Sequence, residues 1–283
     1  MNDEGQLDIL IRNALEEDIG SGDHSSLAAI DPLARGKGLL KIKEDGVLAG
    51  MGVARKIFNY LQPEILFTPF KKDGDEMRAG EIAFEVKALV HTLLKGERVV
   101  LNCMQRMSGI ATLTRQYIEK LKPYGTRLLD TRKTTPNFRL LEKEAVRIGG
   151  GFNHRFGLYD MIMLKDNHID FCGGIVKAIE KAYTYVQTKH PGLKIEVETR
   201  NIEEVKHVVA VGKVDRIMLD NFTPEDIAAA LLIIDGRYET EASGGINLHN
   251  IEIYAATGVD YISSGAIIHQ ARSLDMSLKA SIL

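Results

Sequence analysis

The spacing of hydrophobic residues changes along the chain, and each spacing predicts a different kind of structure. Over residues 7–15 hydrophobic residues recur at helical spacing, which predicts a helix that ends near Asp18. Between residues 38 and 90 short apolar runs alternate with Gly and Asp, a pattern typical of a strand-rich layer. A hydrophobic stripe over residues 100–121 then predicts one long helix that ends before Pro123. The first part of the chain therefore predicts a mixed α/β domain.

The second half of the chain repeats a strand-like run followed by a helical pattern. Such runs begin at Met161, Lys194, Arg216, Tyr238 and Asp260, and the last four starts are 22 residues apart. A strand, a turn and a helix repeated at one period indicate parallel βα units. The repeat continues without a reversal, which favours a barrel over an open sheet. Because fewer than eight units are visible, we expect an incomplete parallel α/β barrel.

Composition narrows the class of protein. Of 283 residues, 45% are hydrophobic and 27% are charged, which is enough apolar material for a large core. A net charge of −3 argues against a general binder of nucleic acid or of membrane surfaces. We expect no membrane span, because no apolar stretch approaches the roughly 20 residues that a bilayer requires. We also expect no signal peptide, because the sequence starts with acidic residues.

The two cysteines indicate in which cellular compartment the protein works. Cys103 and Cys172 both lie within apolar runs, and their positions match neither a disulfide pair nor a metal motif. Free cysteines of this kind usually behave as small buried hydrophobic residues. We therefore expect two reduced core thiols in a cytoplasmic protein.

The ends of the strand-like runs carry candidate chemistry. In βα barrels the catalytic groups stand at the carboxyl ends of the strands. Loops of small residues let backbone N–H groups approach a phosphate, although Gly also ends many βα turns for steric reasons. Glu196 would lie on the same side of its strand as Glu198, where a solvated or salt-bridged edge is the simpler interpretation. The ends carry one cation, two carboxylates and two loops of small residues: Lys165, Glu198, Asp220, Ser243-Gly244-Gly245 and Ser264-Gly265.

Positive charge concentrates between Arg132 and Lys165, where seven Lys and Arg residues stand against three acidic ones. Arg132-Lys133 and His154-Arg155 lie beside Thr-Thr-Pro and triple-Gly stretches, in backbone that should be irregular. Clustered Arg and Lys in a net acidic protein suit a small polyanion. The residues thus predict a barrel enzyme acting on a phosphorylated, multiply anionic small molecule. Three other basic residues fit the solvated face of a helix at four-residue spacing: Arg139, Lys143 and Arg147.

These basic residues belong to a longer set of motifs that follow one another along nearly the whole chain. The most specific motif is Asp130-Thr131-Arg132-Lys133-Thr134-Thr135-Pro136. The other motifs are Leu15-Glu16-Glu17-Asp18, Gly22-Asp23, Glu97-Arg98, Leu101-Asn102, Ser108-Gly109-Ile110-Ala111-Thr112, Gly149-Gly150-Gly151, Asn153-His154-Arg155, Leu164-Lys165-Asp166-Asn167-His168, Glu196-Val197-Glu198, Leu219-Asp220-Asn221 and Ala242-Ser243-Gly244-Gly245-Ile246. In these motifs the chain resembles the quinolinate phosphoribosyltransferases.

The resemblance implies an α/β fold of the type II phosphoribosyltransferase kind. An N-terminal mixed α/β sandwich over residues 1–113 would precede an incomplete parallel α/β barrel over 114–269, and residues 270–283 would pack back on the first domain. The implied enzyme is a pentosyltransferase that moves phosphoribose from phosphoribosyl pyrophosphate to quinolinate with decarboxylation. Nicotinate mononucleotide, pyrophosphate and carbon dioxide would leave, as a step of NAD biosynthesis.

The resemblance also implies roles for individual residues. Arg132, Arg155 and His154 would hold the two quinolinate carboxylates, with Lys133 and Lys165 close by. Arg98 would reach the pocket from the neighbouring subunit of a homodimer. Lys133, Lys165, Glu198 and Asp220 would be the catalytic residues, Glu198 and Asp220 facing the ribose hydroxyls. Mg²⁺ would be the cofactor, bound through the phosphoribosyl donor near those two carboxylates rather than by a defined set of protein ligands. The donor's phosphates would contact Ser243, Gly244, Gly245, Ser264 and Gly265.

Three other functions compete with this prediction. A related phosphoribosyltransferase that uses nicotinate would lack part of the set Arg98, Arg132, His154 and Arg155, all of which are present. A lipoyl- or biotinyl-type carrier would explain the turn at residues 73–81, but no hairpin offers a Lys for modification. A sugar-phosphate aldolase would use Lys165 to form a Schiff base. His168 stays open between a structural role, bonded to backbone, and a place beside the ligand.

Overall fold

The computed structural model describes residues 3–283, and the chain divides into two compact units. The first unit comprises the chain up to Arg115 together with Thr134–Gly150 and Ile267–Leu283. The second comprises Gln116–Lys133 and Gly151–Ala266. The domain boundaries expected at residues 113 and 269 stay a prediction. Among the described residues, no helix combines the length and the apolar character needed to cross a membrane.

The first unit is built on an antiparallel sheet, as its strand-rich pattern predicts. The strands run in the order β12-β1-β5-β3, and a two-stranded sheet pairs β2 with β4. β12 pairs with β1 over seven residue pairs, from Gly36 with Ile282 to Ile42 with Met276. The strands are β1 (Arg35–Ile42), β2 (Gly46–Val47), β3 (Leu66–Pro69), β4 (Glu76–Met77), β5 (Ile82–Leu89) and β12 (Met276–Ile282).

Five helices accompany this sheet in the described part of the chain, and two of them differ from the sequence pattern. The helix expected to end near Asp18 ends at Ile19. α3 was not expected, and α4 begins ten residues before the predicted stripe because Gly96 interrupts the pattern. A Cβ on Gly96 would lie 2.7 Å from the Phe58 ring, so this glycine permits close packing. The helices are α1 (Asp3–Ile19), α2 (His24–Ala29), α3 (Met51–Leu61), α4 (Val90–Leu121, which continues into the second unit) and α5 (Arg139–Gly149).

The second unit contains the parallel sheet that the repeat predicts. Its six strands follow the order β7-β8-β9-β10-β11-β6, and an isolated parallel bridge between Leu129 and Phe152 extends the β6 edge. Every β7–β11 strand begins within one residue of the predicted start, so the incomplete parallel α/β barrel is confirmed. The strands are β6 (Arg127–Leu129), β7 (Ile162–Leu164), β8 (Ile195–Thr199), β9 (Arg216–Asp220), β10 (Glu239–Ser243) and β11 (Tyr261–Ser263).

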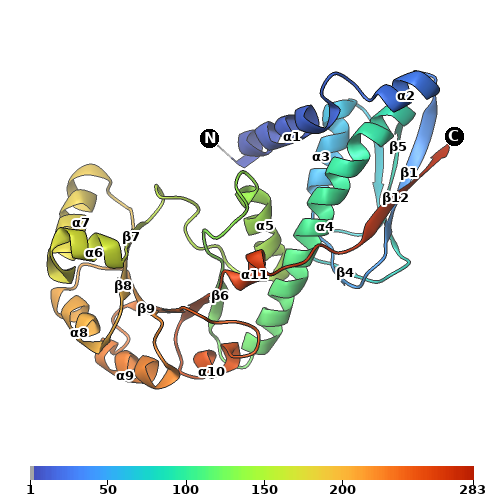
Figure 1. The fold of residues 1–283 in the computed structure, drawn as a ribbon. Coiled ribbons are helices and arrows are strands. Elements are labelled where there is room, and N and C mark those ends of the chain that lie inside the picture. Colours follow the sequence, from blue (N-terminus) through green and yellow to red (C-terminus); the bar gives the residue numbers. More distant parts are fainter. Residues whose placement is uncertain (1–2) are drawn as a thin grey trace. The chain divides into compact units, whose positions relative to one another are not determined.

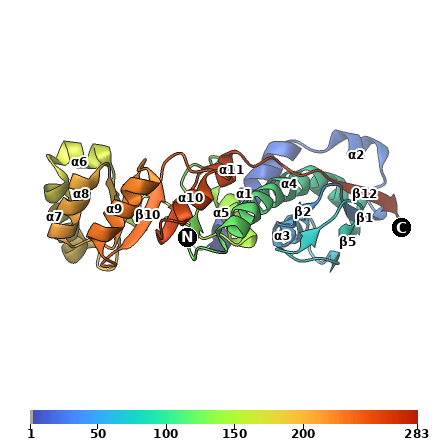
Figure 2. The same ribbon diagram turned by 90° about the horizontal axis from the view of Figure 1, so that it is seen from below.

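The helices of this unit lie along the outer side of its sheet. Figure 1 shows them in sequence from yellow to orange around the strands, and Figure 2 shows α7, α8, α9 and α10 in the same succession. Outward-facing strand residues such as Val197, Ile217 and Ala242 are fully buried beneath them. The helices are α6 (Asp166–Cys172), α7 (Ile175–Lys189), α8 (Ile202–Val211), α9 (Pro224–Ile234), α10 (Ile251–Ala255) and α11 (Ala266–His269, which continues into the first unit).

The inner face of the parallel sheet is polar. Most inward-facing residues of β8, β9 and β10 are charged, and Arg216 of β9 pairs with Glu239 and Glu241 of β10. Parallel sheets usually bury apolar residues on both faces, so this face is an exception that points to chemistry. The inward-facing charged residues are Glu196, Glu198, Arg216, Asp220, Glu239 and Glu241.

Two expectations about buried residues need correction. Cys103 is buried, as expected, and burial raises the pKa of its thiol to about 12. Cys172 is only partly buried, because it is the last residue of α6 and precedes an exposed turn. Lys143 is buried rather than solvated, because the middle turns of α5 are covered on most sides, whereas Arg147 is exposed.

Candidate functional site

Three charged side chains meet at the carboxyl ends of β7, β8 and β9. Lys165 Nζ lies 2.9 Å from Glu198 Oε2, and the Lys165 side chain keeps 47% of its surface exposed. Burial raises the pKa of Asp220, and the negative charge of Glu198 raises it further, while Lys165 opposes both. We call Lys165, Glu198 and Asp220 the rim triad. The parallel pairing of β7, β8 and β9 thus brings together three residues that lie 22 or more positions apart in the sequence.

The loop after β10 packs tightly against the end of β9. Gly244 has a φ of +99°, and a Cβ there would lie 2.2 Å from the Asn221 side-chain oxygen, so no larger residue fits. Asn221 donates from its backbone N–H to Ser243 O at 2.8 Å and from its amide to Asp220 Oδ2 at 2.6 Å. A Cβ on Gly245 would instead meet no atom within 4 Å. The Ser243-Gly244-Gly245 loop therefore lies beside Asp220 and leaves open space at Gly245.

The loop after β11 uses its serine internally. Ser264 is buried, and its hydroxyl donates to Ile246 O at 2.8 Å. Its backbone N–H donates to Leu129 O at 3.1 Å. This serine therefore fixes the backbone that follows the Gly245 loop. Gly265 is partly exposed and directly precedes α11.

Arg132 and Arg155 lie in the irregular segments that follow β6, near enough for their charges to interact. Arg155 is partly buried, and burial together with the positive charge of Arg132 lowers its pKa. Arg155 Nη1 lies 3.3 Å from Met161 O, to which it donates. Lys133 is exposed in the first of these segments. The negative charges of Glu196 and Asp160 partly offset the repulsion between Arg132 and Arg155, and an anionic ligand would offset it further.

Arg98 lies in the first unit. It is exposed on α4. The other predicted site residues with charged side chains belong to the second unit.

Asp130 connects the two basic segments and was not expected as a site residue. It is fully buried at the end of β6. Its Oδ1 accepts the His154 backbone N–H at 2.9 Å, and its Oδ2 accepts the Asn153 side-chain amide at 2.6 Å. The rule that pointed to Lys165, an ionisable residue just after a strand, also applies to Asp130, but the sequence pattern did not predict β6.

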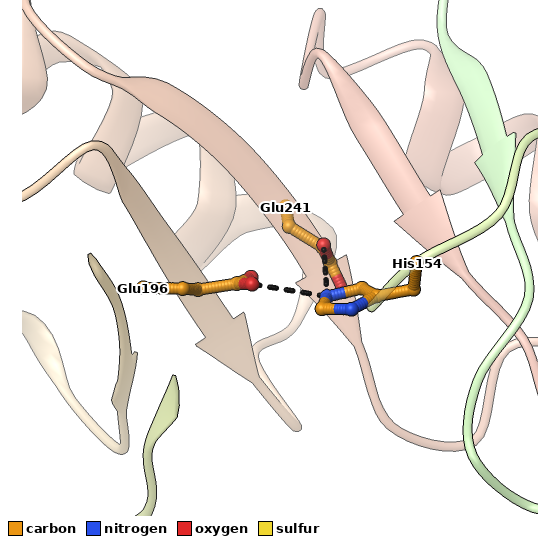
Figure 3. A group of neighbouring side chains, drawn as sticks. All are labelled: His154, Glu196 and Glu241. Atoms are coloured by element: carbon orange, nitrogen blue, oxygen red, sulfur yellow. Dashed lines mark ion pairs between the residues drawn. The ribbon is translucent and has the colours of Figure 1, made fainter. Parts of the chain in front are cut away.

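His154 lies in a buried group of three side chains. Its Nε2 is 3.0 Å from Glu196 Oε2 and 3.3 Å from Glu241 Oε2, as Figure 3 shows. The His154 side chain is 5% exposed, and both carboxylates are fully buried. We call His154, Glu196 and Glu241 the buried triad. Glu196 is therefore not at a solvated edge, and Glu241 was missed although it alternates with Glu239 as Glu198 does with Glu196.

The electrostatics of the buried triad depend on its protons. Burial lowers the pKa of His154, but the two carboxylates outweigh burial and raise the pKa to about 9. Burial, with the charge of Glu241, raises the pKa of Glu196 to about 7. His154 Nδ1 accepts the Arg155 backbone N–H at 2.7 Å. A second ring proton would displace that hydrogen bond, so the charged ring and the hold on Arg155 exclude each other.

Arg216 balances the buried negative charge from the other side. Its Nη1 lies 3.1 Å from Glu241 Oε2 and its Nη2 lies 3.1 Å from Glu239 Oε2. Its guanidinium stacks over the Tyr261 ring at 4.1 Å. The ligand-type atoms of the buried triad lie within 4.8 Å of one another, which would suit a metal ion. A guanidinium bonded to the same Glu241 oxygen works against a second cation there.

His168 has a structural partner. Its Nδ1 accepts the backbone N–H of Lys165 at 2.9 Å, at the start of α6. This bond fixes the backbone that carries Lys165, and it agrees with the structural alternative for His168.

Comparison with known families shows to which family the chain belongs. The family model for the N-terminal domain of quinolinate phosphoribosyl transferase matches residues 23–108, and the model for the C-terminal domain matches residues 110–279. The chain belongs to the quinolinate phosphoribosyltransferase family. The resemblance carried by the Asp130–Pro136 motif is thereby confirmed.

Individual members of the family are similar over nearly the full length. The chain is 42% identical over 288 residues to the chloroplastic nicotinate-nucleotide pyrophosphorylase (carboxylating) of Arabidopsis thaliana, covering 96% of this chain and 82% of that protein. It is 42% identical to the probable nicotinate-nucleotide pyrophosphorylase (carboxylating) of Bacillus subtilis, covering 98% and 94%. The crystal structure of NadC from Streptococcus pyogenes superposes with a TM-score of 0.92 at 43% identity, covering 98% and 97%. These matches confirm the α/β fold class.

Proposed function

We propose that this chain is a pentosyltransferase that transfers phosphoribose from phosphoribosyl pyrophosphate to quinolinate and releases carbon dioxide. The products are nicotinate mononucleotide and pyrophosphate, and the reaction belongs to NAD biosynthesis. Family membership supports the reaction class. The observation that supports the substrate is the interaction between the charges of Arg132 and Arg155, two guanidinium groups in a chain whose net charge is negative.

The guanidinium pair is suited to a dicarboxylate. Each Arg can donate two parallel hydrogen bonds to one carboxylate, and Lys133 adds a movable charge. Quinolinate carries two carboxylates and nicotinate carries one. Nicotinate would leave one of the cations without a partner, which costs about 1–3 kcal/mol for a desolvated group. The site therefore discriminates between the two acids by charge.

The rim triad is suited to the ribosyl donor. Departure of pyrophosphate leaves positive charge on the ribose, and fixed carboxylates facing it stabilise that charge. Glu198 and Asp220 supply these carboxylates, and Lys165 moves from its ion pair with Glu198 toward the leaving phosphates. The Gly244-Gly245 loop offers backbone N–H groups to phosphate. Because the Ser264 hydroxyl is bonded to Ile246 O, Ser264 and Gly265 contribute through their backbone.

Mg²⁺ fits this site as a companion of the donor. Carboxylate oxygens are the ligands that Mg²⁺ prefers, and Glu198 and Asp220 lie close enough for their charges to interact. When bound, the ion neutralises negative charge on the departing pyrophosphate. Glu198 and Asp220 would then face both the ribose hydroxyls and the ion.

The structure of the product explains why no decarboxylation cofactor is required. Once the quinolinate nitrogen carries the ribose, it is positively charged. The electron pair left at the adjacent carbon, when carbon dioxide departs, is stabilised by that charge. The role of the protein is to hold the departing carboxylate in place, which we assign to Arg132 and Arg155.

The assembly and the location follow as parts of the proposal. Arg98 is exposed on α4, which leaves it able to enter the pocket of a second copy in a homodimer. We further propose a cytoplasmic location, in keeping with two unpaired cysteines. Cross-linking and sedimentation of the purified protein would measure the oligomeric state.

One assay separates this function from its competitors. The protein is incubated with Mg²⁺, phosphoribosyl pyrophosphate and either quinolinate or nicotinate, and the nucleotide product is measured. Quinolinate should be the better substrate by at least about tenfold, the factor that corresponds to about 1.4 kcal/mol. Equal use of nicotinate would contradict the charge argument. Trapping of a sugar phosphate on Lys165 by borohydride would support an aldolase instead.

A further inference from the structure

A buried ion pair joins α4 to α5 in the first unit. Glu142 of α5 is fully buried, and Arg106 of α4 keeps 22% of its side chain exposed. Arg106 donates from Nε and from Nη2 to Glu142 Oε1, at 3.0 and 2.8 Å. Apolar residues of similar volume often stabilise a fold as well as a buried ion pair does, so stability alone is a weak reason for this pair. Its further hydrogen bonds indicate what it does.

Glu142 also holds the segment that follows Arg132-Lys133. Its Oε2 accepts the backbone N–H of Thr135 at 2.8 Å, and its Oε1 accepts the Thr135 hydroxyl at 2.9 Å. A carboxylate accepts about four hydrogen bonds, so Arg106 and Thr135 together use the full capacity of Glu142. Residues 130–138, between β6 and α5, adopt turns and irregular backbone. Glu142 therefore fixes this irregular segment two residues beyond Lys133.

Arg106 holds a second segment that adjoins a predicted substrate contact. Its Nη2 also donates to Ile268 O at 2.9 Å, and its Nη1 donates to Ala271 O at 2.5 Å. Ile268 lies on α11, three residues beyond Gly265. One guanidinium thus fixes α11 directly and the segment after β6 through Glu142.

We propose that Arg106 and Glu142 are positioning residues of the enzyme. Glu142 holds the segment that carries Lys133, for quinolinate, and Arg106 in addition holds α11, which follows the phosphate loop at Gly265. This inference rests on the proposed function, because that function assigns the two segments to the two substrates. A site must hold its side chains within about 0.5 Å of the productive geometry, which an irregular segment does not secure on its own.

The competing explanation is that the pair only stabilises the fold. Loss of stability lowers the fraction of folded enzyme, which lowers kcat per mole of protein and leaves KM for both substrates unchanged. Loss of positioning weakens the contacts between the folded enzyme and its substrates, so it raises KM. The two KM values therefore distinguish the explanations.

Two variants should differ in which substrate they affect. Glu142→Gln keeps the shape but places an amide NH₂ opposite a donor. It should raise KM for quinolinate about tenfold, by analogy with groups that orient metal ligands, and change KM for the ribosyl donor by less than about twofold. The donor is spared because Arg106 keeps its bonds to α11. Arg106→Met removes both connections and should raise both KM values about tenfold.

Gln105→Met is the matched control. Gln105 precedes Arg106 on α4, is partly buried as Arg106 is, and donates from its side-chain amide to Met276 O at 3.0 Å. It thus holds the same C-terminal segment, but at β12 rather than at α11, and its substitution should leave both KM values unchanged. If the other variants do not fold, Thr135→Val removes only the hydroxyl of an exposed residue and should raise KM for quinolinate about threefold.

The outcomes are distinguishable. A wild-type protein that makes no nucleotide from quinolinate refutes the proposed function. If the wild type is active and the variants lose kcat or thermal stability with both KM values unchanged, the positioning role alone is refuted. The same conclusion follows if Gln105→Met raises KM as much as Arg106→Met, or if Glu142→Gln raises both KM values equally.

Discussion

The inner face of the barrel carries two triads of similar composition that differ in the exposure of their basic member. Each combines one basic and two acidic side chains, and β8 contributes Glu198 to one and Glu196 to the other, two residues apart. In the rim triad the Lys165 side chain is 47% exposed, whereas in the buried triad the His154 side chain is 5% exposed. The Lys165 ammonium can reach solvent and exchange partners although its carboxylate partner Glu198 is only 8% exposed, whereas an ion pair that is buried on both sides is costly to break. From this difference in burial we infer that the rim triad takes part in substrate chemistry and that the buried triad keeps the interior rigid.

Removing a rim carboxylate should have the largest effect on activity. We expect Glu198→Ala to lower kcat about 100- to 1000-fold, the range found when one group that stabilises transition-state charge is lost. Because Lys165 is half exposed and can turn to solvent when its partner is removed, the loss of activity should exceed the loss of stability. Steady-state kinetics and thermal unfolding measure the two effects. A variant that loses its fold rather than its activity would place Glu198 with the buried triad.

Removing either guanidinium should act on the other substrate. We expect Arg132→Ala and Arg155→Ala to raise KM for quinolinate about 10- to 100-fold, equivalent to one hydrogen-bonded charge of about 1.5–3 kcal/mol. KM for phosphoribosyl pyrophosphate should stay nearly constant. Arg147→Ala, on the exposed end of α5, is the control and should leave both constants unchanged. Equal changes in KM for quinolinate and in KM for phosphoribosyl pyrophosphate would contradict the assignment of Arg132 and Arg155 to quinolinate.

The smallest expected effect is a pH dependence of stability that only the buried triad produces. The pKa of His154 is raised from 6.5 to about 9, so its stabilising contribution is complete below pH 6.5 and is lost as the pH rises through 9. The pKa of Glu196 is raised from 4.5 to about 7, so this residue also makes the folded state more stable at lower pH. The unfolding temperature of the wild type should fall by several degrees more between pH 7 and 9.5 than that of Glu196→Leu. Identical slopes would mean that the carboxylates do not hold His154 protonated.

The sequence predicts the rim better than the interior, for a physical reason. The strand-like runs mark the strand ends, so the pattern alone places Lys165, Glu198 and Asp220 at one edge of the sheet. Burial, by contrast, depends on what packs against a residue. Glu196 and Lys143 both look solvated in the sequence and are both buried, because tertiary contacts cover them. Glu241 follows the same alternation as Glu196 but has no strand-end position to draw attention to it.

The first unit shows the same division. Its strand-rich pattern is visible in the sequence, but the pairing of β12 with β1 joins residues more than 200 positions apart. Sequence periodicity carries no information on such a pairing, and the expectation that residues 270–283 return to the first domain came from the family resemblance. Gly109 illustrates the cost of substituting a packed position: a Cβ there would lie 1.9 Å from the Arg272 carbonyl oxygen. This glycine lets the segment before β12 pack closely against α4.

Coupling between ribosyl transfer and decarboxylation is the most direct test of the proposed reaction. The protein is given quinolinate labelled at the carboxyl group next to the ring nitrogen, and labelled carbon dioxide and pyrophosphate are counted in the same sample. We expect equal amounts of both, and neither product when phosphoribosyl pyrophosphate is omitted. Pyrophosphate without labelled carbon dioxide, or carbon dioxide without the ribosyl donor, would contradict the assignment of this chain as a decarboxylating quinolinate phosphoribosyltransferase.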